Sequence, residues 1–382
     1  MTTTMTQNKM REYTDKYFLR ANEILKKDGL NPWVNMQVFV RKGPGKVAGI
    51  NEAVDLILDN SNIAEVGGRI YAKKEGSLYY PKETLMNIIA PAQSIMELET
   101  VYLGVIAAAM TKENDKRDID LNSIKRNIEQ VAELVDDRSI LYFGARHWHY
   151  EMDKAISRAA FEAGASDCST DNGAETRGKR GIGTIPHALE NIYAYKYGLE
   201  NAVVESTKAF DKYMSKEIPR VALVDYANKE ITDSINTANA LNGNLNAVRI
   251  DTCGENLAEG AKEGNRKYWE GKGVTVSAAY ALREALGDKM GIVLSSGFSN
   301  PEKIKAFNQG EKHYGVKLYD SIGAGFLDGV RTSTADIIAI GESPDEVDLL
   351  KKFINGNLDR KNVIHKVGRP PILNERLEEV LI

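Results

Sequence analysis

Cysteine and histidine are scarce in this chain: its 382 residues include two cysteines and five histidines. Two cysteines, Cys168 and Cys253, cannot complete a structural zinc site alone, and such sparing use of cysteine is typical of a reducing compartment. No apolar stretch approaches the roughly 20 residues of a membrane span. The polar first residues also lack the apolar core of a signal peptide. These absences predict a cytoplasmic protein with no membrane partner.

An excess of either charge is also missing. The chain has 50 Lys and Arg against 54 Asp and Glu, a net charge of −4, whereas nucleic-acid binding usually needs a basic face. We therefore expect no nucleic-acid partner. Hydrophobic residues make up 42% and charged residues 27% of the sequence, as in ordinary globular proteins. At this length one core is not enough, so we expect two domains.

Residues 1–110 predict a small α/β sandwich domain with connecting helices. Residues 34–41 alternate apolar and polar side chains, as in a half-buried strand, and residues 51–58 have helical spacing. Strand character returns at residues 63–73, where a glycine pair indicates a bulge or turn. Residues 83–110 carry apolar side chains at helical period, which predicts one or two long helices.

From about residue 139 the pattern becomes strand, loop and helix, repeated. The candidate strands are residues 139–143, 181–184, 220–225, 247–251, 291–295, 316–320 and 337–341. Apolar runs separated by amphipathic helices, such as residues 228–241 and 301–309, indicate a parallel sheet covered by helices. Such units fit a closed or nearly closed α/β barrel over residues 111–342, with an open doubly wound sheet as the alternative. Residues 343–382 predict a helix and an extended end that returns to the sandwich domain.

Polar residues and glycines follow the predicted strands. They are Arg146, His187, Asp225, Arg249, Asp251 and the glycine-bearing turns at residues 295–300 and 321–325. In parallel α/β folds, ligands bind at the edge where the strands end. Three of the five histidines fall between residues 143 and 187, among several cations. This clustering favours a small, multiply charged anion as the ligand.

The two glycine-bearing turns each follow a predicted strand. Glycine lets backbone amides approach an anion closely, and a helix N-terminus adds its dipole. One such turn is more often only a turn. Two in succession near the end of a barrel form the usual phosphate site of that fold. The pattern leaves phosphate binding and a purely structural role as equal alternatives.

Six motifs, in this order along the chain, resemble those of nicotinate phosphoribosyltransferase. They are DKYF at residues 15–18, FGARHWH at 143–149, GTIPHA at 183–188, RIDT at 249–252, SGF at 296–298 and GAG at 323–325. The shorter archaeal-type members of the family are most similar. The resemblance runs from about residue 15 to about residue 370, and the order of the motifs makes it specific.

The resemblance implies a type II phosphoribosyltransferase fold, in which a smaller α+β sandwich lies beside an incomplete parallel α/β barrel. It also implies a homodimer, paired head to tail with shared active sites. The implied reaction joins nicotinate to phosphoribosyl pyrophosphate (PRPP) and yields nicotinate mononucleotide and pyrophosphate, a salvage step toward NAD. ATP hydrolysis would be coupled through a phosphohistidine, and Mg²⁺ would accompany the pyrophosphate. No metal-ligating residues are predicted.

Carried over residue by residue, the resemblance assigns catalytic roles to three side chains. His187 would be the phosphorylated histidine. Asp251 would hold the ribose hydroxyls, with Arg249 beside it. Displacing pyrophosphate builds positive charge on the sugar and negative charge on the leaving group. A carboxylate near the sugar, with cations and Mg²⁺ near the pyrophosphate, suits this chemistry.

The remaining roles concern substrate contacts. Tyr17, reaching from the partner subunit, and Phe143 would stack on the two faces of the pyridine ring. Arg146 would face the nicotinate carboxylate, which a guanidinium can bind through two hydrogen bonds. Thr184 would join this substrate site, and Asp225 would be either a second active-site acid or a helix cap.

Backbone amides are implied for the 5-phosphate of PRPP. The residues concerned are Ser296, Gly297, Phe298, Gly323 and Ala324. Lys179 and Arg180 could meet the pyrophosphate, but their place before a predicted strand would put them at the wrong end of the barrel.

Ile185 bears on substrate choice. Nicotinamide-using relatives carry an aspartate at this position, after the Gly-Thr, and it accepts a hydrogen bond from the carboxamide. Isoleucine cannot accept one, and an aspartate would repel an acid, so Ile185 favours nicotinate. The same fold acting on nicotinamide or another pyridine, such as quinolinate, is one alternative.

A non-catalytic binding relative is the other alternative. Two departures from the family raise it: Tyr150 replaces a proline, and CGEN at residues 253–256 replaces a turn that often has Pro and Ser/Arg. The intact His187, Arg146 and Asp251 count against it, because a decayed site would have lost at least one of them.

Overall fold

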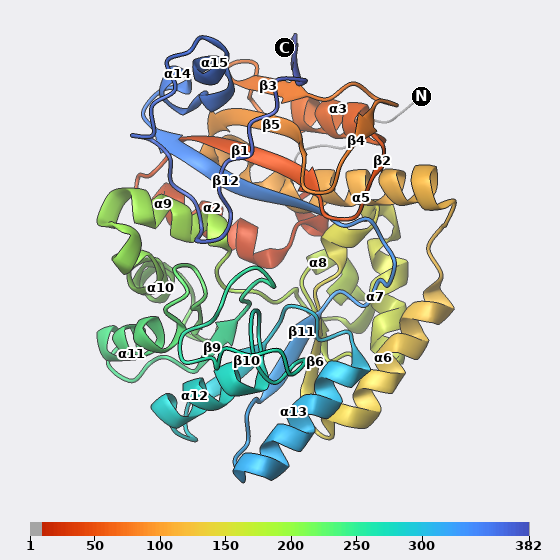
Figure 1. The fold of residues 1–382 in the computed structure, drawn as a ribbon, viewed down its shortest axis with the longest axis vertical. Coiled ribbons are helices and arrows are strands. Elements are labelled where there is room, and N and C mark those ends of the chain that lie inside the picture. Colours follow the sequence, from red (N-terminus) through yellow and green to blue (C-terminus); the bar gives the residue numbers. More distant parts are fainter. Residues whose placement is uncertain (1–9, 382) are drawn as a thin grey trace.

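Two sheets organise the chain, one antiparallel and one parallel, and they lie at opposite ends of the molecule (Figure 1). The structure is a computed structural model, and it describes residues 10–381. The antiparallel sheet has the strand order β12-β1-β5-β3-β13. Its strands are β12 (Ser333–Gly341), β1 (Trp33–Val40), β5 (Thr84–Pro91), β3 (Arg69–Ala72) and β13 (Glu378–Val380). Three of these come from the first hundred residues and two from the last fifty, so both ends of the chain build this sandwich domain.

Helices cover both faces of the antiparallel sheet. Helices α3 (Ile50–Asn60) and α5 (Glu99–Asp115) pack on one face, and the short α14 (Pro344–Val347) and α15 (Leu349–Ile354) pack on the other. Successive side chains of a strand point to opposite faces. Accordingly, Ile88 belongs to the core that contains α5 and Ile89 to the core beneath α14 and α15. In β12 a register shift interrupts the alternation, so Ile337 and Ile340 join the first core while the adjacent Ile338 and Ala339 both join the second.

The alternation in β1 was interpreted as a half-buried strand, and the structure corrects this interpretation. Every residue of β1 after Trp33 is buried. The polar side chains of Asn35 and Gln37 face later parts of the chain. Asn35 donates from Nδ2 to the carbonyl of Val347 at 2.9 Å, and Gln37 donates from Nε2 to the carbonyl of Pro370 at 3.0 Å. The alternation therefore identified a strand with a polar face, but that face is covered by the C-terminal residues.

The prediction of helix over residues 83–110 is wrong at its start. Strand β5 occupies Thr84–Pro91 and is buried throughout. A buried strand has no polar face, so its apolar run can resemble a helical one. The helical part, Ala92–Asp115, has a mean hydropathy of 1.3 over its most apolar window. It is long and apolar enough to cross a membrane, contrary to the expectation from sequence, but 83% of that window is buried inside the protein.

The parallel sheet forms a half-barrel of six strands within the described residues, in the order β7-β6-β11-β10-β9-β8. The strands are β7 (Asp167–Cys168), β6 (Ser139–Tyr142), β11 (Ser321–Ala324), β10 (Gly291–Leu294), β9 (Ala247–Ile250) and β8 (Val221–Leu223). The two end strands, β7 and β8, do not pair with each other, so the barrel is incomplete. The predicted fold class, an incomplete parallel α/β barrel with a smaller sandwich domain, is confirmed.

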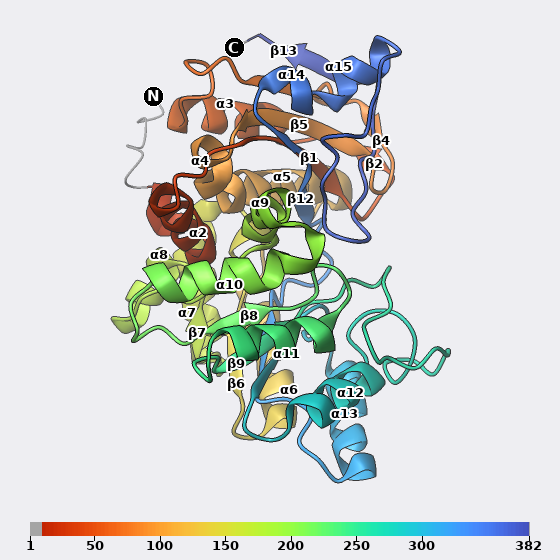
Figure 2. The ribbon, with the colours of Figure 1, turned by 90° about the vertical axis from the view of Figure 1, so that its left-hand side faces the viewer.

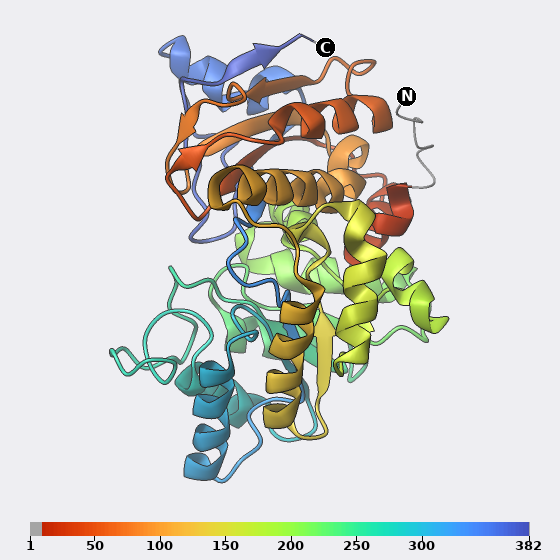
Figure 3. The same ribbon diagram turned by 90° about the vertical axis from the view of Figure 1, so that its right-hand side faces the viewer.

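Helices cover the outside of the half-barrel. Figure 2 shows α10, α11 and α12 along one side, and Figure 3 shows α6, α7 and α13 along the other. Their bounds are α6 (Leu121–Val135), α7 (Asp153–Glu162), α10 (Ala202–Tyr213), α11 (Glu230–Ala240), α12 (Val276–Leu286) and α13 (Pro301–Tyr314). Helices α2 (Lys16–Lys27) and α9 (His187–Tyr197) lie between the two sheets.

Three predicted barrel strands differ from the structure. Residues 181–184 form an extended loop without strand pairing, and β7 takes the place in the sheet that they were expected to fill. Residues 337–341 are a strand, but they belong to β12 of the sandwich domain, so the barrel does not extend to residue 342. The strand expected at residues 316–320 begins five residues later as β11. Just before it, the carboxylate of Asp320 accepts from the backbone amide of Ile292 at 2.8 Å.

Candidate active site

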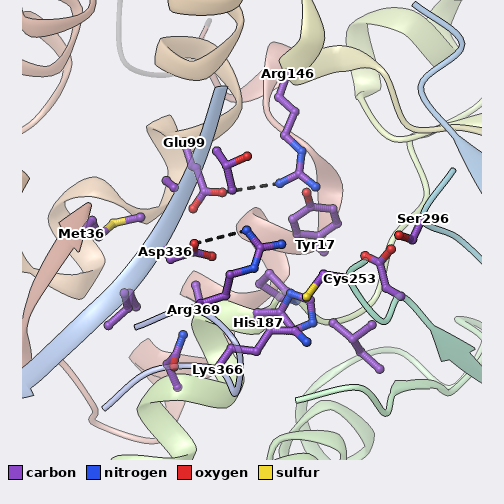
Figure 4. A pocket seen from close by; sticks show the side chains of 18 of the residues that line it. Tyr17, Met36, Glu99, Arg146, His187, Cys253, Ser296, Asp336, Lys366 and Arg369 are labelled. Carbon is purple, nitrogen blue, oxygen red and sulfur yellow. Dashed lines mark ion pairs between the residues drawn. The ribbon is translucent and has the colours of Figure 1, made fainter. Parts of the chain in front are cut away.

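A cavity of about 560 Å³ lies between the two domains, a size typical of small-molecule sites. Its lining includes Met36 on β1, Glu99 on α5 and Asp336 on β12 from the sandwich domain. The barrel contributes the residues that follow β6, β9 and β10. Figure 4 shows Tyr17, Arg146, His187 and Ser296 around the same space. The site is therefore at the carboxyl ends of the parallel strands, as expected from the sequence.

His187 is the first residue of α9, and about 28% of its side chain is exposed. Its Nε2 lies 2.9 Å from Oδ1 of Asp225, which follows β8. No hydrogen bond to Nδ1 is present among residues 10–381. Burial lowers the pKa of His187 and the charge of Lys366 lowers it further, which together outweigh the raising effect of Asp225. The imidazole is therefore neutral at pH 7.

Asp225 was predicted to contact substrate, and the structure gives it different partners. Its side chain is fully buried, and its second oxygen, Oδ2, lies 2.7 Å from Nζ of Lys366. Burial alone would raise the pKa of Asp225, but Lys366 and His187 outweigh burial and lower it. Both carboxylate oxygens of Asp225 are engaged and its side chain has no exposed surface. Asp225 therefore contacts His187 and not a ligand.

Arg249 and Asp251 lie at and just beyond the end of β9, and Nη2 of Arg249 is 2.6 Å from Oδ2 of Asp251. The guanidinium also donates from Nε to Oγ of Ser295 at 3.0 Å. It lies 5.4 Å from the centre of the Phe143 ring. Arg249 therefore connects the predicted ribose carboxylate to one of the predicted aromatic residues.

Tyr17 lines the cavity of its own chain, and its reach into the site of a partner subunit stays a prediction. The loop at Gly183 lies against it: a Cβ at that glycine would be 3.1 Å from the Tyr17 ring. Gly183 has φ +141°, outside the usual range for other residues. The Tyr17 hydroxyl donates to Oδ2 of Asp15 at 3.1 Å.

Arg146, in the loop after β6, lies 3.6 Å from Glu99 of α5. Sequence reasoning did not single out Glu99, which is the first residue of α5. The side chain is almost fully buried, and burial raises the pKa of Glu99 to about 8, against the lowering effect of Arg146. Glu99 is thus mostly neutral at pH 7, and Arg146 is open to a substrate anion.

The first glycine-bearing turn follows β10 as predicted. Ser296 and Gly297 both adopt left-handed backbone conformations, with φ +69° and +84°. Helix α13 follows, capped by Asn300, whose Oδ1 accepts from the amide of Glu302 at 2.9 Å. Phe298 is fully buried and lies beneath the turn. The turn thus combines exposed amides with a helix N-terminus, two features of phosphate sites.

Lys303, one turn into α13, is a residue that sequence reasoning did not single out. Its side chain is 7% exposed, and Nζ donates to the carbonyl of Ser296 at 2.8 Å. It lies 4.4 Å from the ring of Phe298. Within residues 10–381 no carboxylate lies within 4.0 Å of it, and burial lowers the pKa of Lys303 to about 7. The Lys303 amine, directly beside the turn, is therefore about half protonated at pH 7 and has no ionic partner in the described part of the chain.

The second glycine-bearing turn is not a turn at Gly323 and Ala324. Both residues are in β11, opposite Leu141 and Tyr142 of β6. A Cβ at Gly323 would lie 2.3 Å from a ring carbon of Phe143. The missing side chain therefore makes room for an aromatic ring. The two residues form the end of a strand and not a turn, and their contact with phosphate stays a prediction.

Other predicted positions are accounted for by structural contacts. Thr184 donates from its hydroxyl to the carbonyl of Val221 at 2.8 Å. Lys179 pairs with Asp167, and Arg180 is 84% exposed, so neither lines the cavity. Ile185 does line it and is buried. Cys168 and Cys253 are both free and buried.

The turn at residues 253–256, which departs from the family pattern, has a role in this chain. Glu255 lies 2.7 Å from Arg41, at the end of β1, and 2.7 Å from Lys82. Asn256 donates from Nδ2 to the carbonyl of Val367 at 2.8 Å. The turn therefore ties the barrel to the sandwich domain and to the C-terminal residues.

Cations in the cavity are already paired with acids. In the described part of the chain, the Arg and Lys side chains that line it form the pairs Arg41–Glu255, Arg146–Glu99, Arg249–Asp251, Lys366–Asp225 and Arg369–Asp336. Figure 4 marks two of these pairs. Glu99 is mostly neutral at pH 7, with a pKa of about 8, so an anionic ligand can bind to Arg146 directly, whereas at the other four cations it must displace a carboxylate.

Comparisons with known proteins agree with this architecture. Residues 15–110 match the family model described as quinolinate phosphoribosyl transferase, N-terminal domain. The structure is similar to nicotinate phosphoribosyltransferase from Porphyromonas gingivalis, with a TM-score of 0.61, 13% identity, and coverage of 93% of this chain and 92% of that one. It is also similar to nicotinate phosphoribosyltransferase from Vibrio cholerae, with a TM-score of 0.58, 12% identity, and coverage of 91% and 93%.

Nicotinate-nucleotide pyrophosphorylase from Pyrococcus furiosus shares 24% identity over 96% of this chain and 80% of that one, but its TM-score of 0.42 is too low to support a fold assignment. The fold therefore rests on the matches above 0.5, and the N-terminal domain rests on its family model. Residues 15–110 thus match the N-terminal domain of quinolinate phosphoribosyl transferase, and the chain as a whole shares its fold with the two nicotinate phosphoribosyltransferases.

Proposed function

We propose that the protein is a nicotinate phosphoribosyltransferase that forms nicotinate mononucleotide and pyrophosphate from nicotinate and PRPP. One observation carries the proposal: a single cavity at the carboxyl edge of the half-barrel gathers Arg146, His187, Asp251 and the turn at Ser296. Each comes from a different strand-to-helix connection. Each also has the chemistry that one part of this reaction requires.

The pyridine is bound by Arg146, beside Tyr17 and Phe143. The nicotinate carboxylate pairs with the guanidinium, which can donate two parallel hydrogen bonds. Neutral Glu99, with a pKa of about 8, leaves this cation free to pair. The ring nitrogen then faces the sugar-binding end of the cavity, where Asp251 and Arg249 lie.

Bond exchange occurs at C1 of the ribose. The nitrogen of nicotinate forms a bond to C1 while the bond from C1 to the pyrophosphate oxygen breaks. Asp251 stabilises the positive charge that develops on the sugar, because a carboxylate fixed in place costs no reorganisation. The turn at Ser296 and the ammonium of Lys303 hold the 5-phosphate and thereby orient C1.

Mg²⁺ enters this site with the substrate. Within residues 10–381 no group of three or more His, Cys, Asp or Glu could hold a metal ion. Phosphate oxygens and waters are the ligands that Mg²⁺ prefers. A Mg²⁺ ion bound through the phosphates of PRPP would supply charge that neutralises the leaving pyrophosphate.

ATP is coupled through His187. The neutral imidazole has its Nε2 engaged by Asp225, which leaves the lone pair of Nδ1 as the nucleophile. Nδ1 forms a bond to the γ-phosphorus of ATP, the bond from that phosphorus to the bridging oxygen breaks, and ADP leaves. Hydrolysis of the phosphohistidine then returns the free enzyme.

Two other pyridines are the alternatives. Quinolinate is favoured by the N-terminal domain match, but its second carboxylate needs a second free cation. The nearest candidate, Arg369, is already 3.5 Å from Asp336. Nicotinamide would need a hydrogen-bond acceptor for its amide, and the buried Ile185 offers none. A homodimer is also proposed, because the resemblance to the family implies one.

The test is product formation by purified protein with PRPP and Mg²⁺, comparing nicotinate, nicotinamide and quinolinate, with and without ATP. We expect turnover of nicotinate alone and stimulation by ATP. His187→Ala should lose that stimulation but keep a basal rate, while His313→Ala, an exposed histidine, should behave as wild type. Turnover of quinolinate or nicotinamide instead would replace the proposed substrate, and no turnover of any pyridine would favour a binding protein.

A further inference from the structure

The C-terminal segment, defined as residues 355–377 between α15 and β13, crosses the cavity and contacts both domains. Figure 4 shows two of its side chains, Lys366 and Arg369, within the site. The amide of Val367 donates to the carbonyl of Tyr226 at 3.1 Å in the barrel. The amide of Ile372 donates to Oε1 of Gln37 at 2.9 Å in the sandwich domain. The segment is thus held on both sides of the site.

Lys366, near the middle of this segment, is buried. Its side chain is 4% exposed, and Nζ makes two contacts with one residue: 2.7 Å to Oδ2 of Asp225 and 2.5 Å to the carbonyl oxygen of Asp225. Two contacts to the side chain and the backbone of one residue fix both its position and its rotamer. The other carboxylate oxygen is left to accept only from His187.

Because Asp225 is a buried carboxylate, it can only accept hydrogen bonds. The nitrogen facing it, Nε2 of His187, must therefore carry the proton, and the neutral ring exposes its lone pair at Nδ1. Which nitrogen is protonated thus depends on where Asp225 is held. A buried charge with one partner removed is strongly disfavoured, so Asp225 without Lys366 would rely on His187 alone for its compensating charge.

We propose that Lys366 is a positioning residue that holds Asp225 in place and thereby keeps His187 neutral, with its proton on Nε2 and Nδ1 open to the cavity. The functional part of this inference rests on the proposed ATP-coupled reaction, since a nucleophilic Nδ1 is what that reaction needs. The C-terminal segment, which the motifs of the sequence left without a role, is then part of the catalytic site.

Charged groups around His187 come from four elements. Asp225 follows β8, Lys366 comes from the C-terminal segment, and Asp251 follows β9 with Arg249 paired to it. Glu190, one turn along α9, is fully buried, and burial raises its pKa well above the usual value, so it adds no charge. Removing the lysine leaves burial, which lowers the pKa of the imidazole, opposed by the two aspartates, which raise it.

The test compares Lys366→Met with Lys366→Arg, which keeps the charge, and with Lys361→Met, an exposed lysine of the same segment. The ring nitrogens of the five histidines are followed by ¹⁵N NMR as a function of pH in the substrate-free protein. His187→Ala assigns the signal. The spectra report both the pKa and the protonated nitrogen, and the other four histidines show whether each variant is folded.

In the wild type we expect His187 to titrate below the ordinary value of about 6.5 with its proton on Nε2. Lys366→Met should raise its titration midpoint by on the order of one pH unit, while Lys366→Arg and Lys361→Met should leave it low. An unchanged midpoint and proton position in folded Lys366→Met would overturn the proposal, as would an equal shift in Lys361→Met. Should the methionine variant not fold, Lys366→Gln takes its place with the same expectations.

A second readout links the proposal to catalysis. The acid limb of the ATP-dependent rate should move upward in Lys366→Met by the same shift as the NMR midpoint, whereas the rate without ATP should keep its pH profile. A uniform fall in both rates, with no change of profile, would indicate a structural role only and would overturn the proposal. The NMR measurement needs no substrate, so failure of the proposed reaction would appear in the turnover assay alone.

Discussion

The two sheets of this protein differ in how their strands are built and in what they bring to the cavity. Strands β1 and β5 of the sandwich domain are eight residues long and buried along almost their whole length. The barrel strands have two to four residues each. Long antiparallel strands pair over many residues and form a rigid sheet. Short parallel strands all end at one edge of their sheet, so the loops that follow them lie close together.

The cavity takes different chemistry from each side. Arg146, His187, Arg249 and Asp251 come from barrel loops, where each can be placed independently near a reacting atom. The sandwich residues that face them, such as Glu99, lie on long buried elements and contact the barrel cations instead. For the proposed reaction, we expect the barrel residues to contact the reacting atoms and the sandwich residues to adjust which anion the barrel cations accept.

The largest effect should come from the barrel. We expect Asp251→Asn to lower kcat for nicotinate by about 10²–10³-fold, because a fixed carboxylate opposite the developing positive charge is worth this much in comparable sites. Steady-state kinetics with nicotinate and PRPP measure the effect. Asp288→Asn, at an exposed position, is the control. A fall of less than about threefold would remove Asp251 from the reaction and break the comparison.

Lys303→Met tests the phosphate end of the barrel. A charge-assisted hydrogen bond contributes about 1.5–3 kcal/mol, so the KM for PRPP should rise roughly 10- to 100-fold with little change in the KM for nicotinate. The wild type should show a related pH effect. Since the pKa of Lys303 is about 7, raising the pH above 7 removes the proton and should raise the KM for PRPP.

Lys305→Met is the matched control for Lys303, since this neighbouring lysine is exposed and pairs only with Glu302 on the same helix. An equal change of KM in both variants would mean that general charge, rather than the buried ammonium, attracts PRPP.

Gly323→Ala tests whether the strand glycine serves packing rather than phosphate binding. The new Cβ would meet the ring of Phe143 at 2.3 Å, and overpacking of this kind costs about 1–3 kcal/mol. Denaturant unfolding should show the loss, and the KM for nicotinate should rise because Phe143 moves. Gly254→Ala, where nothing lies within 4 Å of the new atom, should be stable. A selective rise in the KM for PRPP would instead restore the phosphate role.

The smallest effect at neutral pH should come from the sandwich side. Glu99→Gln should change the KM for nicotinate less than about twofold at pH 7, because the acid is mostly neutral there with a pKa of about 8. As the pH rises through 8, Glu99 ionises and competes for Arg146. The wild-type KM should therefore rise about tenfold between pH 7 and 9, and the variant should show no such rise. Parallel profiles would show that Glu99 does not adjust substrate binding.

The sequence located the site better than it located the elements that build it. Arg146, His187 and Asp251 were found because polar groups after apolar runs mark strand ends. The strand at residues 84–91 was missed because a strand buried on both faces has no period of two. Residues 316–320 resembled a strand, but Asp320 uses its side chain to cap a neighbouring strand, and the pairing begins only at Ser321.

Glu99, Lys303 and Lys366 could not have been found by motif. Their importance depends on burial and on which partner each one meets, and these partners are 47, 7 and 141 positions away in the sequence (Arg146 with Glu99, Ser296 with Lys303, Asp225 with Lys366). Long-range contacts of this kind leave no local pattern.

By itself, the sequence determined the fold class, the order of the loop residues and their place at the strand ends, because periodicity and motif order are local properties of the chain. The tertiary structure decided the charge states and the roles. Burial leaves Glu99 mostly neutral and the pKa of Lys303 near 7, and it places Lys366 against Asp225. Desolvation and ion pairing depend on what surrounds a group in space, and only the folded chain brings those surroundings together.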